Sequence, residues 1–140
     1  MSLYNTILVT LEDTPTDRAI IEHIKSLAQA MKSRVVLLHV ASSVPAKYHR
    51  SDAAGKEIEE SKASLERVRA EFKAVSIPAE VALAYGEPVK EIVNWVKQNG
   101  CDLVAMSTHG HQFMADLVLG TTAIHVQHSI SVPVLMLRAK

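Results

Sequence analysis

Short apolar runs alternate with helical patterns from one end of this chain to the other, and this alternation constrains the fold more than any other feature. Strands that are buried on both faces have apolar residues at consecutive positions, whereas half-exposed strands alternate apolar and polar residues. Five runs with apolar residues at consecutive positions are interpreted as strands: Ile7–Leu11, Arg34–Val40, Val81–Ala84, Leu103–Met106 and Val134–Leu137. Such strands, separated by helices, predict an α/β fold built on a parallel sheet with helices on both faces.

Four segments between these strands have apolar residues at the three- and four-residue spacing of an amphipathic helix. The first helix is expected to begin at Thr14, an N-cap candidate that is followed by Pro15 at the first helical position. The other three are placed around Ile58–Phe72, from Pro88 to a left-handed cap at Gly100, and from Leu117 to about His128. Residues 41–52 have no clear period and are interpreted as a long loop.

The length and composition fit one globular domain that spans residues 1–140. Hydrophobic residues make up 48% of the chain and charged residues 21%, which is typical of globular proteins and not of disordered chains. No apolar run approaches the roughly 20 residues that span a bilayer, and the N-terminus lacks the pattern of a secretion signal. We therefore expect a cytoplasmic protein that does not associate with membranes.

The formal charges cancel, because fifteen basic residues balance fifteen acidic ones. A neutral domain lacks the long-range field that recruits nucleic acid or anionic lipid, so neither is expected as a partner. Cys101 is the one cysteine of the sequence, which excludes an internal disulfide and fits a reducing cytoplasm. We interpret it as a small buried residue without a redox role.

The segment after the fourth expected strand has the features of a phosphate site. Ligands of parallel sheets bind beyond the carboxyl ends of the strands. Here the strand leads into Ser107-Thr108-His109-Gly110, nine residues follow, and Gly120-Thr121-Thr122 enters the next helix. Glycines let the backbone approach an anion, and hydroxyl groups beside free helix N–H groups favour phosphate. The structural alternative makes Gly110 a turn residue and Gly120 a close helix–strand contact.

These residues resemble the motif of the universal stress protein family, in which Gly-x-x-Gly is followed by nine residues and then by Gly-Ser/Thr. Here the motif is Ser107-Thr108-His109-Gly110, nine residues, Gly120-Thr121. Shorter likenesses follow in the order of the family: Ile7-Leu8-Val9, Leu37-Leu38-His39-Val40, Gly86-Glu87-Pro88, Asp102-Leu103-Val104 and Val132-Pro133-Val134-Leu135. The resemblance therefore covers essentially the whole chain.

The resemblance implies a Rossmann-like fold with an open parallel five-stranded sheet in the order 3-2-1-4-5, and a homodimer formed partly through the last strand. It also implies an adenine nucleotide, ATP or AMP with or without Mg²⁺, wrapped by the loop after the fourth strand. The nucleotide-binding residues that it implies are Thr10, Leu11, Glu12, Val40, Met106, Ser107, His109, Gly110, Gly120, Thr121 and Thr122.

Two of these positions depart from the family pattern, since Ser107 stands in place of the first glycine and Glu12 in place of an aspartate. A serine is strained if the backbone there needs a positive φ, and otherwise its hydroxyl adds a hydrogen bond. Glu12 keeps a carboxylate for a ribose hydroxyl or a Mg²⁺-bound water, and the neighbouring Asp13 could substitute for it.

No enzyme motif accompanies the phosphate segment. The chain has no Gly-x-Ser-x-Gly elbow and no Walker A sequence, and residues 107–122 contain no lysine or arginine to stabilise a leaving phosphate. We therefore expect binding and no catalytic residues. Slow ATP hydrolysis, with Glu12 or Asp13 placing Mg²⁺, is a weaker hypothesis.

The histidines do not predict a metal site. His109 and His111 are two residues apart, and His125 and His128 are three apart on one expected helix. No cysteine cluster or His-Glu-x-x-His sequence accompanies either pair, so a protein-held metal is not expected.

Two classes of function remain compatible with the sequence. The first is a nucleotide-dependent stress-response module that binds an adenine nucleotide. The second is a dimeric stress-response interaction protein that binds no nucleotide.

Overall fold

The computed structural model describes residues 3–41, 52–108 and 121–139, without the side chains of residues 52–54 and 121. Its elements are β1 (Thr6–Thr10), α1 (Asp17–Met31), β2 (Arg34–Ala41), α2 (Asp52–Ala74), β3 (Ala79–Tyr85), α3 (Pro88–Asn99), β4 (Leu103–Thr108), α4 (Thr121–Ser129) and β5 (Val134–Arg138). Each predicted strand and helix has a counterpart in this order.

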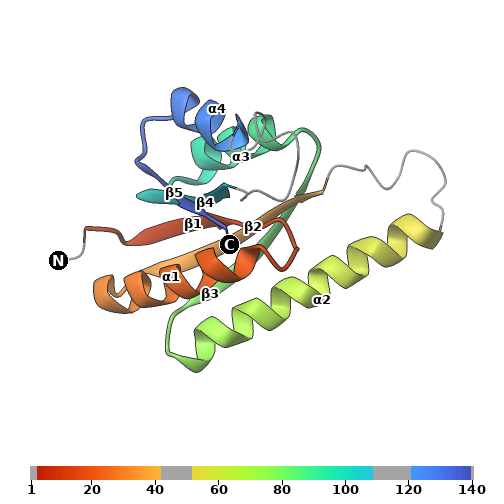
Figure 1. The fold of residues 1–140 in the computed structure, drawn as a ribbon, viewed down its shortest axis with the longest axis horizontal. Coiled ribbons are helices and arrows are strands. Elements are labelled where there is room, and N and C mark those ends of the chain that lie inside the picture. The colour runs from red at the N-terminus through yellow and green to blue at the C-terminus, as the bar shows by residue number, and fades with distance from the viewer. Residues whose placement is uncertain (1–2, 42–51, 109–120, 140) are drawn as a thin grey trace.

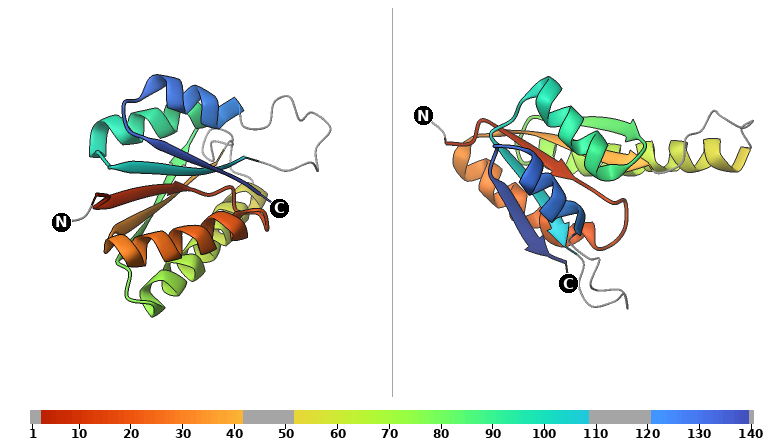
Figure 2. Two further views of the ribbon diagram at one scale, coloured as in Figure 1. Left: turned by 60° about the vertical axis from the view of Figure 1, so that its left-hand side comes forward. Right: turned by 90° about the horizontal axis from the view of Figure 1, so that it is seen from above.

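The five strands form one sheet in the order β3-β2-β1-β4-β5, and every neighbouring pair is parallel (Figure 1). Helices α1 and α2 cover one face of the sheet, and α3 and α4 cover the other (Figure 2). The predicted Rossmann-like α/β fold, with its strand order and its helices on both faces, is confirmed.

The core explains why the strands are apolar at consecutive positions. In the central strand β1, Ile7 and Val9 pack with α1 and α2, whereas Leu8 packs with α3 and α4. All three side chains are fully buried. A strand with a helical layer on each face has no solvent-exposed side, so a polar residue here would lose hydration without gaining a partner.

The start of α1 differs from the expectation. The helix begins at Asp17, three residues after Thr14, and its N-cap Thr16 makes no side-chain capping bond. The Asp17 carboxylate accepts hydrogen bonds from backbone N–H groups that precede the helix, including that of Thr14. The sequence Thr-Pro-Thr-Asp resembles a capping sequence. Its aspartate instead accepts hydrogen bonds from the loop before the helix.

The other expected ends agree more closely with the structure. Helix α3 begins at Pro88, after an N-cap at Glu87 whose carboxylate accepts from the Lys90 N–H at 2.9 Å. Gly100 caps its end with φ 81° and ψ 145°, so the positive φ is present but the conformation is not the expected left-handed helical one. The predicted first residues of the fourth helix, 117–120, lie outside the described residues.

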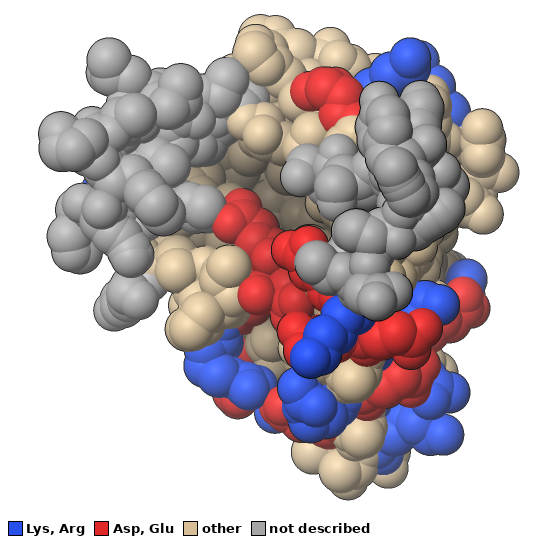
Figure 3. All heavy atoms as spheres, turned by 90° about the vertical axis from the view of Figure 1, so that its right-hand side faces the viewer, with Lys and Arg blue, Asp and Glu red and all other residues tan. Residues whose placement is uncertain are grey.

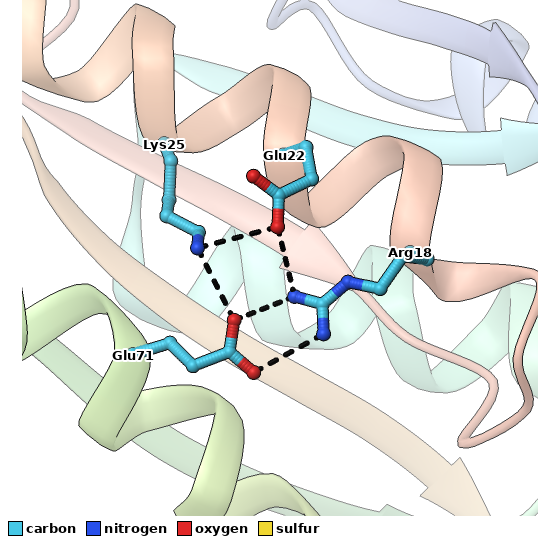
Figure 4. A network of polar contacts seen from close by, with 4 residues as sticks. All are labelled: Arg18, Glu22, Lys25 and Glu71. Atoms are coloured by element: carbon cyan, nitrogen blue, oxygen red, sulfur yellow. Dashed lines mark hydrogen bonds and ion pairs between the residues drawn. The ribbon is translucent and has the colours of Figure 1, made fainter.

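An ion-pair network joins α1 to α2 (Figure 4). Arg18 Nη2 lies 2.5 Å from Glu71 Oε1 and 3.1 Å from Glu22 Oε2, and Lys25 Nζ lies 3.2 Å from Glu71 Oε1. These side chains are partly exposed, so each pair contributes at most about 1 kcal/mol. The network connects α1 to the carboxyl-terminal half of α2, whose Leu65 and Phe72 are buried in the core, while the other half extends past the edge of the sheet (Figure 1).

A bilayer-spanning helix needs a long and strongly apolar sequence. Within the ranges that the structure covers, none of the helices meets both requirements.

Cys101 precedes β4 and is half-buried. Burial raises the pKa of its thiol to about 11, and the neighbouring Asp102 carboxylate acts in the same direction. A raised pKa means that the protonated thiol stabilises the folded state below the ordinary pKa of 9.0, and that this contribution is lost as the pH rises through about 11.

We predict that Cys101 reacts slowly in the folded protein. At pH 8 the thiolate is about a hundredfold scarcer than in the unfolded chain, so alkylation by iodoacetamide is about a hundredfold slower in native buffer than in urea. Mass spectrometry over time at several pH values measures the rate. Equal rates in native buffer and in urea would contradict the shifted pKa.

Candidate functional site

A cavity of about 630 Å³ lies at the carboxyl ends of β1, β2 and β4. Figure 3 shows this end of the molecule, where the surface is hollowed. The chain adds β2 and β3 on one side of β1 and then returns to add β4 and β5 on the other. The strand order therefore reverses at β1, which is the place where open parallel sheets bind ligands.

Much of the group expected to bind a nucleotide is brought together here. Seven of its members line the cavity: Thr10, Leu11, Glu12, Val40, Met106, Ser107 and Thr122. They come from the ends of three strands and from the first turn of α4. Thr121 begins α4, and His109, Gly110 and Gly120 lie outside the described residues.

Sequence reasoning missed the contribution of α2, since no residue of this helix was expected at the site. Glu57, Ile58, Glu60 and Ser61 of this helix line the cavity, and Ser61 is 9% exposed. A signal was present, because Ile58, Ser61 and Leu65 follow one another at helical spacing on a single stripe. A small polar residue within an apolar stripe indicates a polar partner inside the fold.

Asp17 holds the loop that follows β1. Its side chain is 6% exposed, and Oδ1 accepts from the Glu12 N–H at 2.9 Å. Its Oδ2 accepts from the Asp13 N–H at 2.7 Å and from the Thr14 N–H at 3.3 Å. Burial raises the pKa of Asp17, and the three N–H donors oppose that rise. This carboxyl group therefore fixes the backbone that carries Glu12 and Asp13 to the cavity.

Asp13 connects this loop to α2. Its φ is 65°, in the left-handed region that aspartate tolerates better than most residues. Its Oδ2 accepts a hydrogen bond of 2.9 Å from the Ser61 hydroxyl. The cavity wall formed by α2 is thus attached to the loop after β1 through one buried serine.

His39 lies at the end of β2, and its Nδ1 is 2.8 Å from the carbonyl oxygen of Leu11. A carbonyl oxygen accepts only, so Nδ1 carries the proton, and in the neutral ring Nε2 is left as an acceptor. His39 is therefore a hydrogen-bonded residue at the end of the sheet.

Ser107 has a buried hydroxyl without a hydrogen-bond partner in the described structure. A buried polar group that lacks a partner costs about 1–3 kcal/mol, so such a group is unusual outside functional sites. The backbone φ of Ser107 is not positive, and the substitution of serine for the glycine of the family motif therefore causes no backbone strain. The hydroxyl lines the cavity, where a ligand could satisfy it.

The lining of the cavity includes apolar and acidic side chains. Leu38 and Ile92 contribute apolar surface on the α3 and α4 face of the sheet, and Leu83 contributes it on the α1 and α2 face. Apolar side chains of this kind suit the flat face of a ring. Acidic side chains gather beside the hollow in Figure 3, and among the described lining residues Lys and Arg are absent. In the same part of the chain, no group of three His, Cys, Asp or Glu side chains is arranged to hold a metal ion.

Comparison with known proteins identifies relatives over nearly the whole chain. The model of the universal stress protein family matches residues 3–138. The universal stress protein MJ0577 of Methanocaldococcus jannaschii is 23% identical over 157 residues, covering 99% of this chain and 97% of the relative.

Solved structures are similar over the same extent. The structure of MJ0577 has a TM-score of 0.84 at 25% identity, covering 99% of this chain and 98% of that one. A universal stress protein in complex with cAMP has a TM-score of 0.71 at 18% identity, covering 96% of both chains. One from Archaeoglobus fulgidus in complex with dAMP has a TM-score of 0.70 at 17% identity, covering 96% of this chain and 98% of that one. The last two share the fold with this chain.

We predict that Asp17→Ala destabilises the protein by about 1–3 kcal/mol, because three backbone N–H groups lose their acceptor. Urea unfolding followed by circular dichroism measures the change. Glu22→Ala on the same helix removes two partly exposed ion pairs, with Arg18 and with Lys25, and should cost less than about 1 kcal/mol. Equal losses in the two variants would show that Asp17 does not hold the loop.

Proposed function

The chain belongs to the universal stress protein family, and we propose that it binds an adenine nucleotide, ATP or AMP, in the cavity at the carboxyl edge of its sheet. In this proposal the nucleotide regulates a cytoplasmic stress-response module, and its binding state is the signal. The observation that carries the proposal is the convergence of seven expected nucleotide-binding residues on one cavity.

The size and chemistry of the cavity support a nucleotide. Its volume of about 630 Å³ falls within the roughly 300–1,000 Å³ of small-molecule sites. The buried Ser107 hydroxyl supplies a hydrogen-bonding group that lacks a partner in the described structure. Two structural neighbours, in complex with cAMP and dAMP, support adenine as the base.

We assign the parts of the ligand by position. Adenine lies beside Val40 at the end of β2, and the carboxylates of Glu12 and Asp13 accept hydrogen bonds from ribose hydroxyls or hold a water of Mg²⁺. The phosphates lie toward Thr122 at the start of α4, because the N–H groups of the first turn of a helix favour an anion. The glycine motif residues His109, Gly110, Gly120 and Thr121 complete the phosphate side in this proposal.

We propose binding as the function, with ATP hydrolysis slow or absent. Lys and Arg are absent from the described lining of the cavity, so this part of the site has no cationic side chain to neutralise a developing phosphate charge. If hydrolysis occurs, Glu12 and Asp13 are the residues that would place Mg²⁺ for it.

A second candidate function is that of a dimeric interaction protein, and the edge strand β5 favours it. Among the residues that the structure describes, β5 pairs with β4 on one side only, and Met136 on it is 41% exposed. An apolar edge strand invites pairing with another strand. We therefore propose a homodimer through β5, which is compatible with nucleotide binding.

We predict that Ser107→Ala lowers the affinity for AMP about five- to tenfold, because a hydrogen bond to the ligand is lost. The stability of the free protein should be unchanged or higher, since the hydroxyl that is removed had no partner. Isothermal titration of nucleotide-stripped protein with AMP and ATP measures the affinities.

The matched control is Thr108→Ala, which removes the next hydroxyl of β4, outside the cavity lining. This variant should bind AMP as tightly as the wild type. Absence of binding by the wild-type protein at millimolar AMP and ATP would overturn the proposal and favour the interaction protein.

We predict that Met136→Lys converts a dimer to a monomer, because a charge on the edge strand opposes strand pairing. Sedimentation velocity measures the oligomeric state. Tyr85→Lys on the opposite edge strand, β3, is the control and should leave the dimer intact. A monomeric wild-type protein, or a dimeric Met136 variant, would exclude the β5 interface.

A further inference from the structure

We infer that Ser61 of α2 is a positioning residue of the proposed nucleotide site, and that it acts through its hydrogen bond to Asp13. Through this bond, nucleotide binding and the placement of the amino-terminal part of α2 favour one another. The inference rests on the proposed function and adds a form of regulation to it, because the binding state of the cavity then determines how firmly this part of α2 is held.

The burial of Ser61 indicates a specific role for its hydroxyl group. The residue is 9% exposed, and it lies between Ile58 and Leu65 on the apolar stripe of α2. A buried serine in a helix can donate to a carbonyl oxygen of the preceding turn. The Ser61 hydroxyl instead donates to Asp13 Oδ2 at 2.9 Å, across 48 positions of the sequence. This bond joins a helix that lines the cavity to the loop after β1, which also lines it.

Asp13 has a conformation that its surroundings must support. Its φ of 65° is unfavourable for a residue with a side chain. Two contacts hold it, because its N–H donates to Asp17 Oδ2 at 2.7 Å and its carboxylate accepts from Ser61. A carboxylate has two acceptor oxygens, so the bond at Oδ2 orients the group and leaves Oδ1 for a ligand. Without Ser61 the ligand itself would have to order this side chain, and that entropic cost lowers affinity.

The two halves of α2 are held in different ways. The carboxyl-terminal half contributes Leu65 and Phe72 to the core, and its Glu71 pairs with α1. In the part of the chain that the structure describes, the other polar contacts of α2 with neighbouring elements come from Arg69 and Glu71, about two turns or more after Ser61. Where α2 extends past the edge of the sheet, the described polar contact with the rest of the fold is that of Ser61 (Figure 1).

The coupling follows from the loop that the ligand and α2 share. In the proposed function, Glu12 and Asp13 contact the ribose or a water of Mg²⁺, so a bound nucleotide stabilises the loop conformation that accepts the Ser61 bond. Thermodynamic linkage requires that the bond raises nucleotide affinity by the same factor by which the nucleotide favours the bond. One hydrogen bond corresponds to a factor of about five to ten.

The first test titrates nucleotide-stripped protein with AMP, with each variant well below its thermal midpoint, so that a loss of global stability does not change the affinity. Ser61→Ala should bind AMP about five- to tenfold more weakly than the wild type. Ser61→Thr keeps the hydroxyl and should bind within about twofold of the wild type. The control Ser64→Ala, on the same helix but outside the cavity lining, should also stay within about twofold. Binding by Ser61→Thr as weak as that of Ser61→Ala would overturn the role of the hydroxyl.

The second test repeats Ser61→Ala in an Asp13→Gly protein. Glycine adopts a positive φ without strain but has no carboxylate, so the Ser61 bond is absent while the backbone conformation is kept. If Ser61 acts through Asp13, the second substitution should lower AMP affinity by less than about twofold in this background. A further loss of five- to tenfold would show that Ser61 acts by another route.

Hydrogen exchange followed by mass spectrometry measures the coupling in the unsubstituted protein. Saturating AMP should slow the exchange of amides in residues 57–64 more than in residues 66–74, because only the first segment depends on the Ser61 bond. In Ser61→Ala most of this difference should disappear. Equal protection of the two segments in the wild type would overturn the coupling.

The outcomes separate this inference from the proposed function. If the wild type binds neither AMP nor ATP, both fail. If the wild type binds AMP and Ser61→Ala binds it as tightly, the proposed function stands and the role of Ser61 is overturned. If Ser61→Ala does not fold, the two segments compared in the wild type decide the coupling by themselves.

Discussion

The burial of β1 on both faces is the constraint on which the rest of the structure depends. Because β1 is central in the sheet and covered by two helical layers, the chain must leave it toward one side and return toward the other. The connections at its carboxyl end then diverge, and the space between them cannot be filled by a continuous helix. The cavity is thus a consequence of the topology, and the residues at the strand ends decide what the cavity can bind.

Those residues need a fixed backbone, and Asp17 provides it at a thermodynamic cost. Burial of a carboxyl group is unfavourable, which is visible in its raised pKa. The cost is offset by three backbone N–H groups that would otherwise lack partners in the turn between β1 and α1. The left-handed conformation at Asp13 and its bond to Ser61 connect the same turn to α2. The turn is therefore held to the start of α1 by Asp17 and to α2 by Asp13.

The sequence allows the fold and part of the cavity lining to be predicted, and the part that was missed has a physical explanation. Doubly apolar strands such as Val35–Leu38 identify a parallel sheet, while the strand order came from the family resemblance. The ends of parallel strands meet at one edge of the sheet, so Thr10, Val40 and Ser107 were expected at this edge, where they line the cavity. The wall from α2 depends on how a helix is placed over the sheet, which its own periodicity does not determine. The predicted start of α1 at Thr14 was wrong because the Asp17 carboxylate accepts hydrogen bonds from the preceding loop. In the sequence, an aspartate with this role looks the same as one that belongs to a helix cap.

Ser107 stands where the family motif has its first glycine, and it lines the cavity. In a motif that brings backbone close to a phosphate, a serine would be damaging if it required a positive φ or filled the space for the ligand. Its φ is not positive, and its hydroxyl is buried without a partner in the described residues. A chain that kept such a group only for stability would gain by replacing it with alanine. In the proposed nucleotide site, this hydroxyl would add a hydrogen bond to the ligand, and a glycine at the same position has no side chain that could make one.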